Sequence, residues 1–386
     1  MNNTWHQKAI IYSLDVETFY DSNDDGIGDI QGLITKLGYL SSLGVNCIWL
    51  LPYYPSPDHD NGYDVMDYYS IDPKFGTLGD FAELIYKAEH YGIRIIIDLV
   101  VNHTSSKHPW FLEARKDMHS KYRDYYVWSD KPLEFDEEIL MFTGEENTVW
   151  TYDKVAKQYY LHRFYKEQPD LNIANPAVRN EIIKIMGFWL QMGVSGFRID
   201  AAEILIEPYG MNAAERKAVT NILDEMRSYL DARKSDAILI AETNIPPNKT
   251  NVYLNEGRRM HLLFNFFINQ HLFLSLAEGT SSPLANALKK MPEANANQWL
   301  HFLRHHDELS LKLLTDKQQE KVYSRFAPQK NMRIYKNGIR RRLAPMFDWN
   351  EPMMKMAFSL LFSLPGIPLL RYGDEIAMAD NLRLPG

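Results

Sequence analysis

The chain alternates short apolar runs with longer segments of helical periodicity, and this alternation limits its fold more than any other feature. The pattern is typical of repeated strand–helix units and a parallel sheet. Helical periodicity lies between the runs, for example at 31–43, 79–91, 176–192, 212–233 and 353–363. Eight apolar runs, the strand number of a closed α/β barrel, occupy residues 10–19, 47–52, 93–101, 196–200, 237–242, 261–266, 299–307 and 367–375. We therefore predict a (β/α)8 TIM barrel.

Two gaps between the predicted strands are too long for simple loops. Residues 104–175 are rich in aromatic and charged side chains and contain no further strand–helix unit, so we predict an inserted subdomain B there. The barrel itself then comprises residues 1–103 and 176–386. Residues 308–352 form a second, more helical excursion. Its basic run, Arg340-Arg341-Arg342, we interpret as solvated or ion-paired surface.

No helical segment follows the last predicted strand before the sequence ends at LRLPG. We therefore expect the eighth helix of the barrel to be absent and the chain to be truncated relative to a longer protein.

Composition argues against several classes of partner. The 386 residues carry a formal net charge of −8, which disfavours nucleic acid and anionic membrane surfaces. The longest apolar stretch, FSLLFSLPGIPLL, is too short to span a bilayer, and the N-terminus lacks the pattern of a signal peptide. Cys47 is the only cysteine, so no intrachain disulfide is possible. We expect a cytoplasmic protein that contacts neither nucleic acid nor membrane.

Polar residues stand at the C-terminal ends of four predicted strands, the end at which barrel enzymes form their active sites. One acid in such a place can simply cap a helix or pair with an arginine, but four strands that each carry one are difficult to explain by capping. The residues are Asp98, Asn102 and His103 on the third strand, Arg198 and Asp200 on the fourth, Glu242 on the fifth, and His306 and Asp307 on the seventh.

These carboxylates suit the chemistry of glycosidic bonds. A retaining glycosidase uses one ionised carboxylate as nucleophile and a second group as acid and then base. Arg198 points to the same side of its strand as Asp200, so we expect its cation to lower the pKa of that nucleophile and to orient it. Burial at a strand end would raise the pKa of Glu242 toward that of a working acid. Asp307 could stabilise an oxocarbenium-like transition state.

Five segments resemble the signature motifs of the α-amylase superfamily. They are DLVVNHTS (98–105), QPDLN (168–172), GFRIDAAE (196–203), AETN around Glu242, and FLRHHDEL (302–309). They occur in the superfamily's order and cover nearly the whole chain. The resemblance implies a (β/α)8 barrel with a domain inserted after the third strand and a β-sandwich after the barrel. We expect the sandwich to be absent from this sequence.

Within the superfamily, IWLLPYYPSP, HRFYKEQPDLN and GIRRRLAP resemble the trehalose synthase family, which interconverts maltose and trehalose. This resemblance implies a retaining glucosyl mutase that acts on a small α-glucan such as maltose and needs no organic cofactor. It implies Asp200 as nucleophile, Glu242 as acid/base and Asp307 as transition-state stabiliser. It also implies a glucose subsite formed by Tyr63, Asp64, His103, Arg198 and His306.

Two other functions stay open at this point. An α-glucosidase or α-amylase-type hydrolase would use the same residues and replace the retained glucose by water. A non-catalytic amylase-like protein is expected to lose catalytic acids, and this chain keeps all three. One departure from the trehalose synthase pattern is His305, which stands where that family usually has Asn.

The segment DSNDDGIGD (21–29) has the spacing of the first half of a calcium loop. It lacks the distant Glu of an EF-hand, and a solvated acidic turn is the alternative. Similar loops in the superfamily bind calcium or magnesium, so we expect a structural Ca²⁺ or Mg²⁺ here. The ligands would be Asp21, Asn23, Asp25, the carbonyl of Ile27, and Asp29.

The resemblance implies a second structural calcium site, between the barrel and the inserted subdomain. Its ligands would be Asn102, Asp170, Glu207 and the backbone carbonyls of Ile204 and Leu205.

Overall fold

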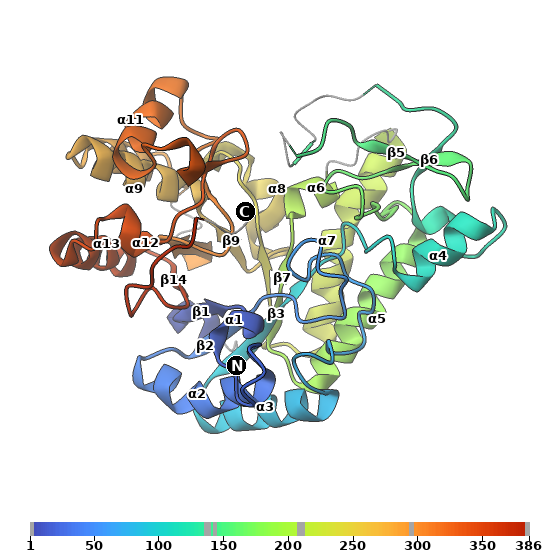
Figure 1. The fold of residues 1–386 in the computed structure, drawn as a ribbon, viewed down its shortest axis with the longest axis horizontal. Coiled ribbons are helices and arrows are strands. Elements are labelled where there is room, and N and C mark those ends of the chain that lie inside the picture. The colour runs from blue at the N-terminus through green and yellow to red at the C-terminus, as the bar shows by residue number, and fades with distance from the viewer. Residues whose placement is uncertain (1–3, 135–139, 142–144, 207–212, 293–296, 383–386) are drawn as a thin grey trace.

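Eight parallel strands close into a barrel in the computed structural model, which describes residues 4–134, 140–141, 145–206, 213–292 and 297–382 (Figure 1). Around the barrel they are β1 (Ile11–Leu14), β2 (Cys47–Leu50), β3 (Arg94–Leu99), β7 (Gly196–Ile199), β8 (Ile238–Ala241), β9 (Leu262–Phe264), β10 (Trp299–Phe302) and β14 (Ile367–Arg371). The eight predicted strands and the barrel are therefore confirmed.

Several strands end earlier than their apolar runs. β1 ends at Leu14, before the first apolar run does, because Asp15 accepts a hydrogen bond from the Glu17 amide and begins the short helix α1 (Val16–Phe19). Likewise β10 stops at Phe302, and residues 303–307 form a loop that carries polar side chains. The catalytic end of the barrel thus consists of loops directly attached to rigid strands.

Long helices surround the barrel, and all but α9 lie at the ranges that the periodicity predicted. They are α2 (Ile30–Ser42), α3 (Leu78–His90), α5 (Pro176–Met192), α7 (Ala213–Arg233), α9 (Phe266–Glu278) and α13 (Glu351–Ser363). Local caps fix where they begin. Asp29 caps α2, Thr77 and Asp80 form a capping box on α3, and Asn175 caps α5 ahead of Pro176.

Successive side chains of a strand point to opposite sides, so the apolar residues of the barrel strands form two layers. Ile48 and Leu50 of β2 belong to the layer between strands and helices, whereas Cys47 and Trp49 belong to the layer inside the barrel. Arg198 on β7 pairs in register with Ile240 of β8, another interior residue. The Arg198 side chain therefore points into the barrel, toward its catalytic end.

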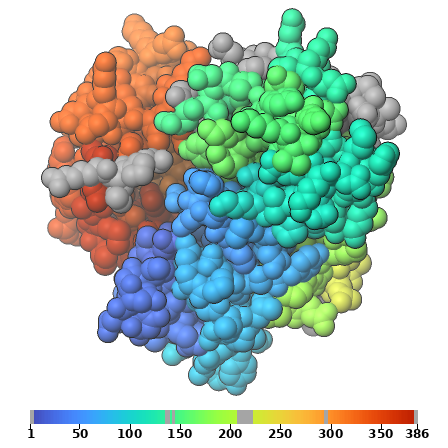
Figure 2. Space-filling model, turned by 45° about the vertical axis from the view of Figure 1, so that its right-hand side comes forward, coloured from blue at the N-terminus to red at the C-terminus, as the bar shows by residue number. Residues whose placement is uncertain are grey.

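Residues 104–175 form a small antiparallel sheet apart from the barrel. Its strands are ordered β4 (Trp128–Ser129), β6 (Gln158–Leu161) and β5 (Trp150–Asp153), and the helix α4 (Pro109–Lys116) and the turn η2 (Arg123–Tyr125) precede it. Figure 2 shows this segment in teal and green over the blue N-terminal residues. Its division from the barrel as a subdomain stays a prediction.

The excursion 308–352 contains β11 (Leu309–Ser310), α11 (Asp316–Phe326), η7 (Lys330–Met332), β12 (Arg333–Ile334), β13 (Gly338–Ile339) and α12 (Leu343–Met346). Two arginines of its basic run are ion-paired, as expected. Arg341 Nε lies 3.2 Å from Asp380 Oδ2, and Arg342 Nη2 lies 3.6 Å from Asp374 Oδ1.

The remaining short elements are η1 (Trp5–Lys8), α6 (Ala202–Ile206), η4 (Pro247–Lys249), α8 (Asn251–Leu254), η5 (Asn255–Gly257) and α10 (Ser282–Leu288). Within the described ranges, no helix combines the length and apolarity needed to cross a membrane.

Candidate active site

One buried guanidinium gathers the acids that the sequence placed at four strand ends. The Arg198 side chain is 1% exposed, and its Nη1 lies 2.5 Å from Asp98 Oδ1 and 2.8 Å from Asp200 Oδ1. Its Nη2 lies 2.5 Å from Glu242 Oε2 and 4.0 Å from Asp307 Oδ2. The ends of β3, β7, β8 and β10 therefore converge on a single point.

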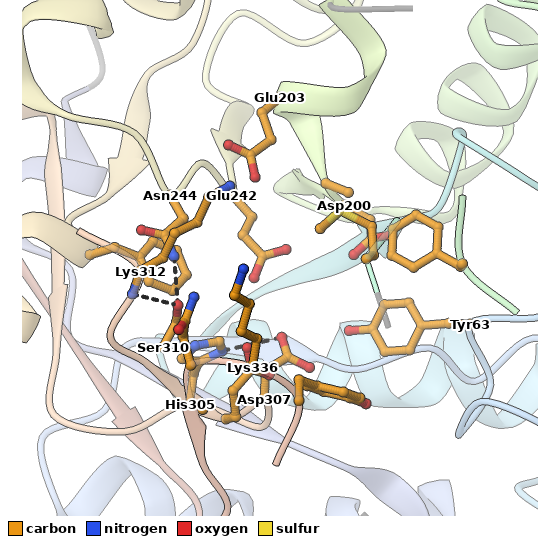
Figure 3. A pocket seen from close by; sticks show the side chains of 18 of the residues that line it. Tyr63, Asp200, Glu203, Glu242, Asn244, His305, Asp307, Ser310, Lys312 and Lys336 are labelled. Carbon is orange, nitrogen blue, oxygen red and sulfur yellow. Dashed lines mark hydrogen bonds and ion pairs between the residues drawn. The ribbon is translucent and has the colours of Figure 1, made fainter. Parts of the chain in front are cut away.

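The three predicted catalytic acids face a common cavity of about 870 Å³ (Figure 3). Six acidic residues and two lysines line it, so acidic groups outnumber basic ones on its wall. The lining residues are Asp60, Tyr63, His103, Leu140, Met141, Phe164, Asp200, Ala201, Glu203, Glu242, Asn244, Phe266, His305, Asp307, Glu308, Ser310, Lys312, Tyr335, Lys336, Asn337 and Gly338.

Burial governs the acidity of this group. It raises the pKa of Glu242 well above the ordinary range, which is the direction predicted for a general acid. Burial also raises the pKa of Asp200, although the sequence led us to expect a lowered one. Arg198 does oppose the shift, but the loss of water around a carboxylate that is 7% exposed outweighs it. Asp307 adds a further upward contribution for both groups.

Three of the predicted substrate-binding residues cluster beside the acids. The Tyr63 hydroxyl lies 2.8 Å from His306 Nε2 and accepts a 3.1 Å hydrogen bond from Arg198 Nη1. The Tyr63 and His306 rings are stacked, with centroids 5.6 Å apart and planes 9° from parallel. His103 Nε2 contacts the Tyr63 carbonyl at 3.2 Å, and burial lowers the His103 pKa to about 3, which leaves the imidazole neutral.

Asp64 does not lie in the cavity, which corrects the predicted sugar anchor. Its carboxylate is 0% exposed and accepts hydrogen bonds from the Ser56 hydroxyl and from the amides of His59 and Asp60. Asp64 therefore holds the preceding loop in shape. The acid of this loop that lines the cavity is Asp60, which accepts a 2.7 Å hydrogen bond from Gln168 Nε2.

Two further features of the site could not be derived from the sequence. Asp98 was recognised as a strand-end acid, but its place against Arg198 follows only from the pairing of Asp98 with Arg198 in the β3–β7 register. Lys336, from the loop between β12 and β13, extends into the cavity from a segment that carried no recognisable motif (Figure 3). The strand-end position and the DLVVNHTS segment did mark Asp98, whereas no sequence signal marked Lys336.

The acidic loop 21–29 folds around its own backbone. The Asp21 carboxylate accepts hydrogen bonds from the amides of Asn23, Asp24 and Gly26, and Asp25 Oδ1 accepts one from Ile27. Asn23 Oδ1 accepts from the Asp25 amide, and Asp25 Oδ2 accepts from Asn23 Nδ2, so a cation would bind to oxygens that already accept hydrogen bonds within the loop.

Asp29 is occupied differently from the other residues of this loop. Its carboxylate accepts hydrogen bonds from the amide and hydroxyl of Ser22 and caps α2 at Gly32. We therefore consider Asp29 the poorest fit among the five predicted ligands.

Three of the ligands implied for the second metal site converge, but they do so on the guanidinium of Arg163. Its Nη2 donates to Asn102 Oδ1 at 2.7 Å, its Nη1 donates to the Ile204 carbonyl at 3.1 Å, and its Nε contacts Asp170. A positive charge therefore already occupies the place expected for calcium, so metal binding here stays a prediction that requires Arg163 to move.

The other two ligands implied for this site add nothing to the fit. Glu207 lies outside the described residues, and of the two backbone carbonyls it is that of Ile204 that accepts a hydrogen bond from Arg163.

Comparison with known proteins agrees with this geometry. The family model "Alpha amylase, catalytic domain" matches residues 12–383. Trehalose synthase/amylase TreS of Mycobacterium tuberculosis is 41% identical over 386 residues, which cover 99% of this chain and 64% of that protein. The trehalose synthase of Thermus thermophilus is 43% identical over 385 residues, which cover 99% of this chain and 39% of that protein.

Solved structures give the same result. The α-amylase of H. orenii has a TM-score of 0.78 at 31% identity, over 97% of this chain and 72% of that one. A variant of the trehalulose synthase MutB in complex with Tris has a TM-score of 0.76 at 28% identity, over 97% of this chain and 66% of that one. The chain, which spans only 64% and 39% of the two trehalose synthases above, belongs to the α-amylase family.

Proposed function

We propose that the protein rearranges the α-glucosidic bond of a disaccharide by double displacement, and that it interconverts maltose and trehalose. The observation that carries this proposal is the shared guanidinium, since Arg198 binds Asp200 and Glu242 through its two terminal nitrogens at the wall of one cavity. The identity of 41% to 43% with proteins named trehalose synthases supports the choice of reaction.

In the first step, Asp200 attacks the anomeric carbon of the non-reducing glucose of maltose. The bond from that carbon to the O4 oxygen of the second glucose breaks, and Glu242 gives its proton to the departing oxygen. A covalent glucosyl ester on Asp200 and a free glucose result. Asp307 is exposed to the cavity and places its negative charge near the oxocarbenium-like transition state.

In the second step, the retained glucose attacks the ester through its O1 hydroxyl. Glu242, now a base, takes the proton of this hydroxyl, and Asp200 leaves as a carboxylate. Two inversions give net retention, and the product is trehalose. If water attacks instead, the product is glucose, so the same residues would serve a hydrolase.

The products formed from maltose distinguish the two reactions. We expect the whole protein to produce trehalose in excess over glucose. Asp200→Asn should reduce both products by about 10³-fold or more, because the nucleophile is lost. Asp231→Asn on α7, which removes an exposed partner of Arg227, is the matched control and should keep full activity. Chromatographic separation of the sugars is the measurement, and glucose without trehalose would show that the protein is a hydrolase.

Substitution by Asn should affect activity at position 60 and stability at position 64. Asp60→Asn should lower kcat/KM for maltose by about 10- to 100-fold, since a charged hydrogen bond to a sugar hydroxyl contributes about 1.5–3 kcal/mol. Asp64→Asn should instead lower the free energy of unfolding, because its bonds to Ser56, His59 and Asp60 are weakened. Kinetics and thermal melts of both variants test this. Lost activity with an unchanged melt for Asp64→Asn would restore Asp64 as the anchor.

Both limbs of the pH profile of kcat/KM should lie at higher pH than ordinary Asp and Glu side chains would give. Catalysis needs Asp200 ionised, and its pKa is raised, so activity should fall below a pH higher than that of an ordinary aspartate. It also needs Glu242 protonated, and its pKa is raised further, so the alkaline limb should lie at higher pH still. The two groups interact, so each limb reports the pair.

Asp60 has a pKa raised to about 7 by burial and could contribute to the acidic limb of this profile. The profile of Asp60→Asn separates the two effects. An acidic limb that moves assigns it to Asp60, and one that stays in place excludes Asp60 as its source.

We also propose that the loop 21–29 holds a structural Ca²⁺ or Mg²⁺ through Asp21, Asn23, Asp25 and the Ile27 carbonyl. Added Ca²⁺ should raise Tm, by the equivalent of about 2.7 kcal/mol at a hundredfold excess over Kd. Asp25→Ala should abolish that response, while Asp231→Ala should keep it. Melting curves with chelator and with Ca²⁺ are the measurement, and identical curves for the unaltered protein would contradict the proposal.

A further inference from the structure

We propose that His305, His306 and Asp307 form a binding site for a transition-metal cation such as Zn²⁺, and that the bound ion competes with the sugar substrate. This site differs from the two structural calcium sites predicted from the sequence, because its ligands are imidazoles and it adjoins the catalytic acids. The competition rests on the proposed function, whereas binding of the metal does not.

Three ligand atoms lie together at this position. One atom from each of His305, His306 and Asp307 falls within 4.8 Å of the other two, and among the described residues this is the group of His, Cys, Asp and Glu side chains with that property. His306 Nε2 lies 3.1 Å and His305 Nδ1 lies 3.5 Å from Asp307 Oδ2. Tetrahedral Zn²⁺ with bonds of about 2.0–2.1 Å places its ligands about 3.3 Å apart, so these two separations already match.

His305 supplies a donor that the protein leaves unused. Its residue is 1% exposed, and neither ring nitrogen has a hydrogen-bond partner. Its ring packs edge-on against Phe264, Phe266 and Phe302, with centroids 4.9–5.9 Å away. A buried polar atom without a partner is costly. A metal ion at the cavity wall would use the lone pair of Nδ1 and remove that cost.

The charge and accessibility of the site favour a cation. His305 and Asp307 both line the cavity, and the Asp307 side chain is 42% exposed, so an ion can enter from solvent (Figure 3). Two contacts oppose binding. Arg198 Nη2 lies 4.0 Å from Asp307 Oδ2, and the Tyr63 hydroxyl holds His306 Nε2 at 2.8 Å. The metal must displace that hydroxyl, so we expect reversible rather than permanent occupancy.

The bound ion would occupy groups that the reaction needs. Asp307 and His306 are the stabiliser and a substrate-binding residue of the proposed mechanism, so they cannot serve metal and glucose together. We therefore expect Zn²⁺ inhibition to be competitive with maltose.

Replacement of His305 by Asn tests the assignment, because an amide nitrogen has no lone pair to offer a transition metal. The whole protein is titrated with ZnCl₂ alone by calorimetry, and with CoCl₂ alone while its visible absorption is followed. We expect one ion per chain and absorption typical of coordinated nitrogen. His305→Asn should weaken binding by at least tenfold, since even the loss of an indirect contact to a metal ligand typically costs about 10–100-fold.

His271→Asn is the matched control, since His271 lies on α9 and its Nδ1 contacts the Phe267 carbonyl. It should bind the metal like the unaltered protein. Melting curves of all variants verify folding, and His305→Gln replaces His305→Asn if the latter does not fold.

Two results would overturn the proposal. One is equal metal affinity in the unaltered protein and in the folded His305 variant. The other is a bound Zn²⁺ that does not compete with maltose, which would place the ion away from Asp307. If maltose is not converted at all, the proposed function fails while the calorimetric and absorption results still decide the site.

Discussion

The site depends on one buried interaction, the contact of the Arg198 guanidinium with carboxylates from four strands. Without a cation, burial would drive such acids to their neutral forms. The interaction exists because β3 and β7 pair in a register that sets Asp98 opposite Arg198, and because alternate residues of a strand face the same way. A slip of one residue in that register would turn Arg198 toward the helices. Strand pairing is therefore the condition for the chemistry.

The sequence could predict the barrel and the strand-end acids that converge on Arg198 because both leave local signals. A buried strand is a run of apolar residues, and an acid such as Glu242 at the end of one run is visible without knowledge of contacts. No such local signal distinguishes the role of Asp60 from that of Asp64. They lie four residues apart in one loop, and only the hydrogen bonds of the folded loop show that Asp64 faces inward.

The direction of the pKa shift of Asp200 could not be predicted from the sequence either. The proximity of Arg198 to Asp200 was predicted, yet the sign of the pKa shift depends on how much water burial removes, which no spacing records. The ligands around Asp170 are a similar case. The family resemblance implied that oxygens gather there, and three of them do, but a metal ion and the Arg163 guanidinium both satisfy the same oxygens. The residue types therefore indicate that a cation is needed there, but not whether it is a metal ion or a guanidinium.

The same reasoning connects catalysis with the proposed metal site. Six acidic residues and two lysines line the cavity, and Arg198 lies beside it, so acidic groups outnumber basic ones there. The ionised acids among them suit an oxocarbenium-like transition state, whose positive charge exists only while the bond is breaking. An electrostatic potential that stabilises the positive charge of the transition state also stabilises a bound metal cation. With a neutral amide at position 305 the site would keep two of its ligands, His306 and Asp307, whereas with His305 it has three. His305 therefore favours metals that prefer nitrogen ligands.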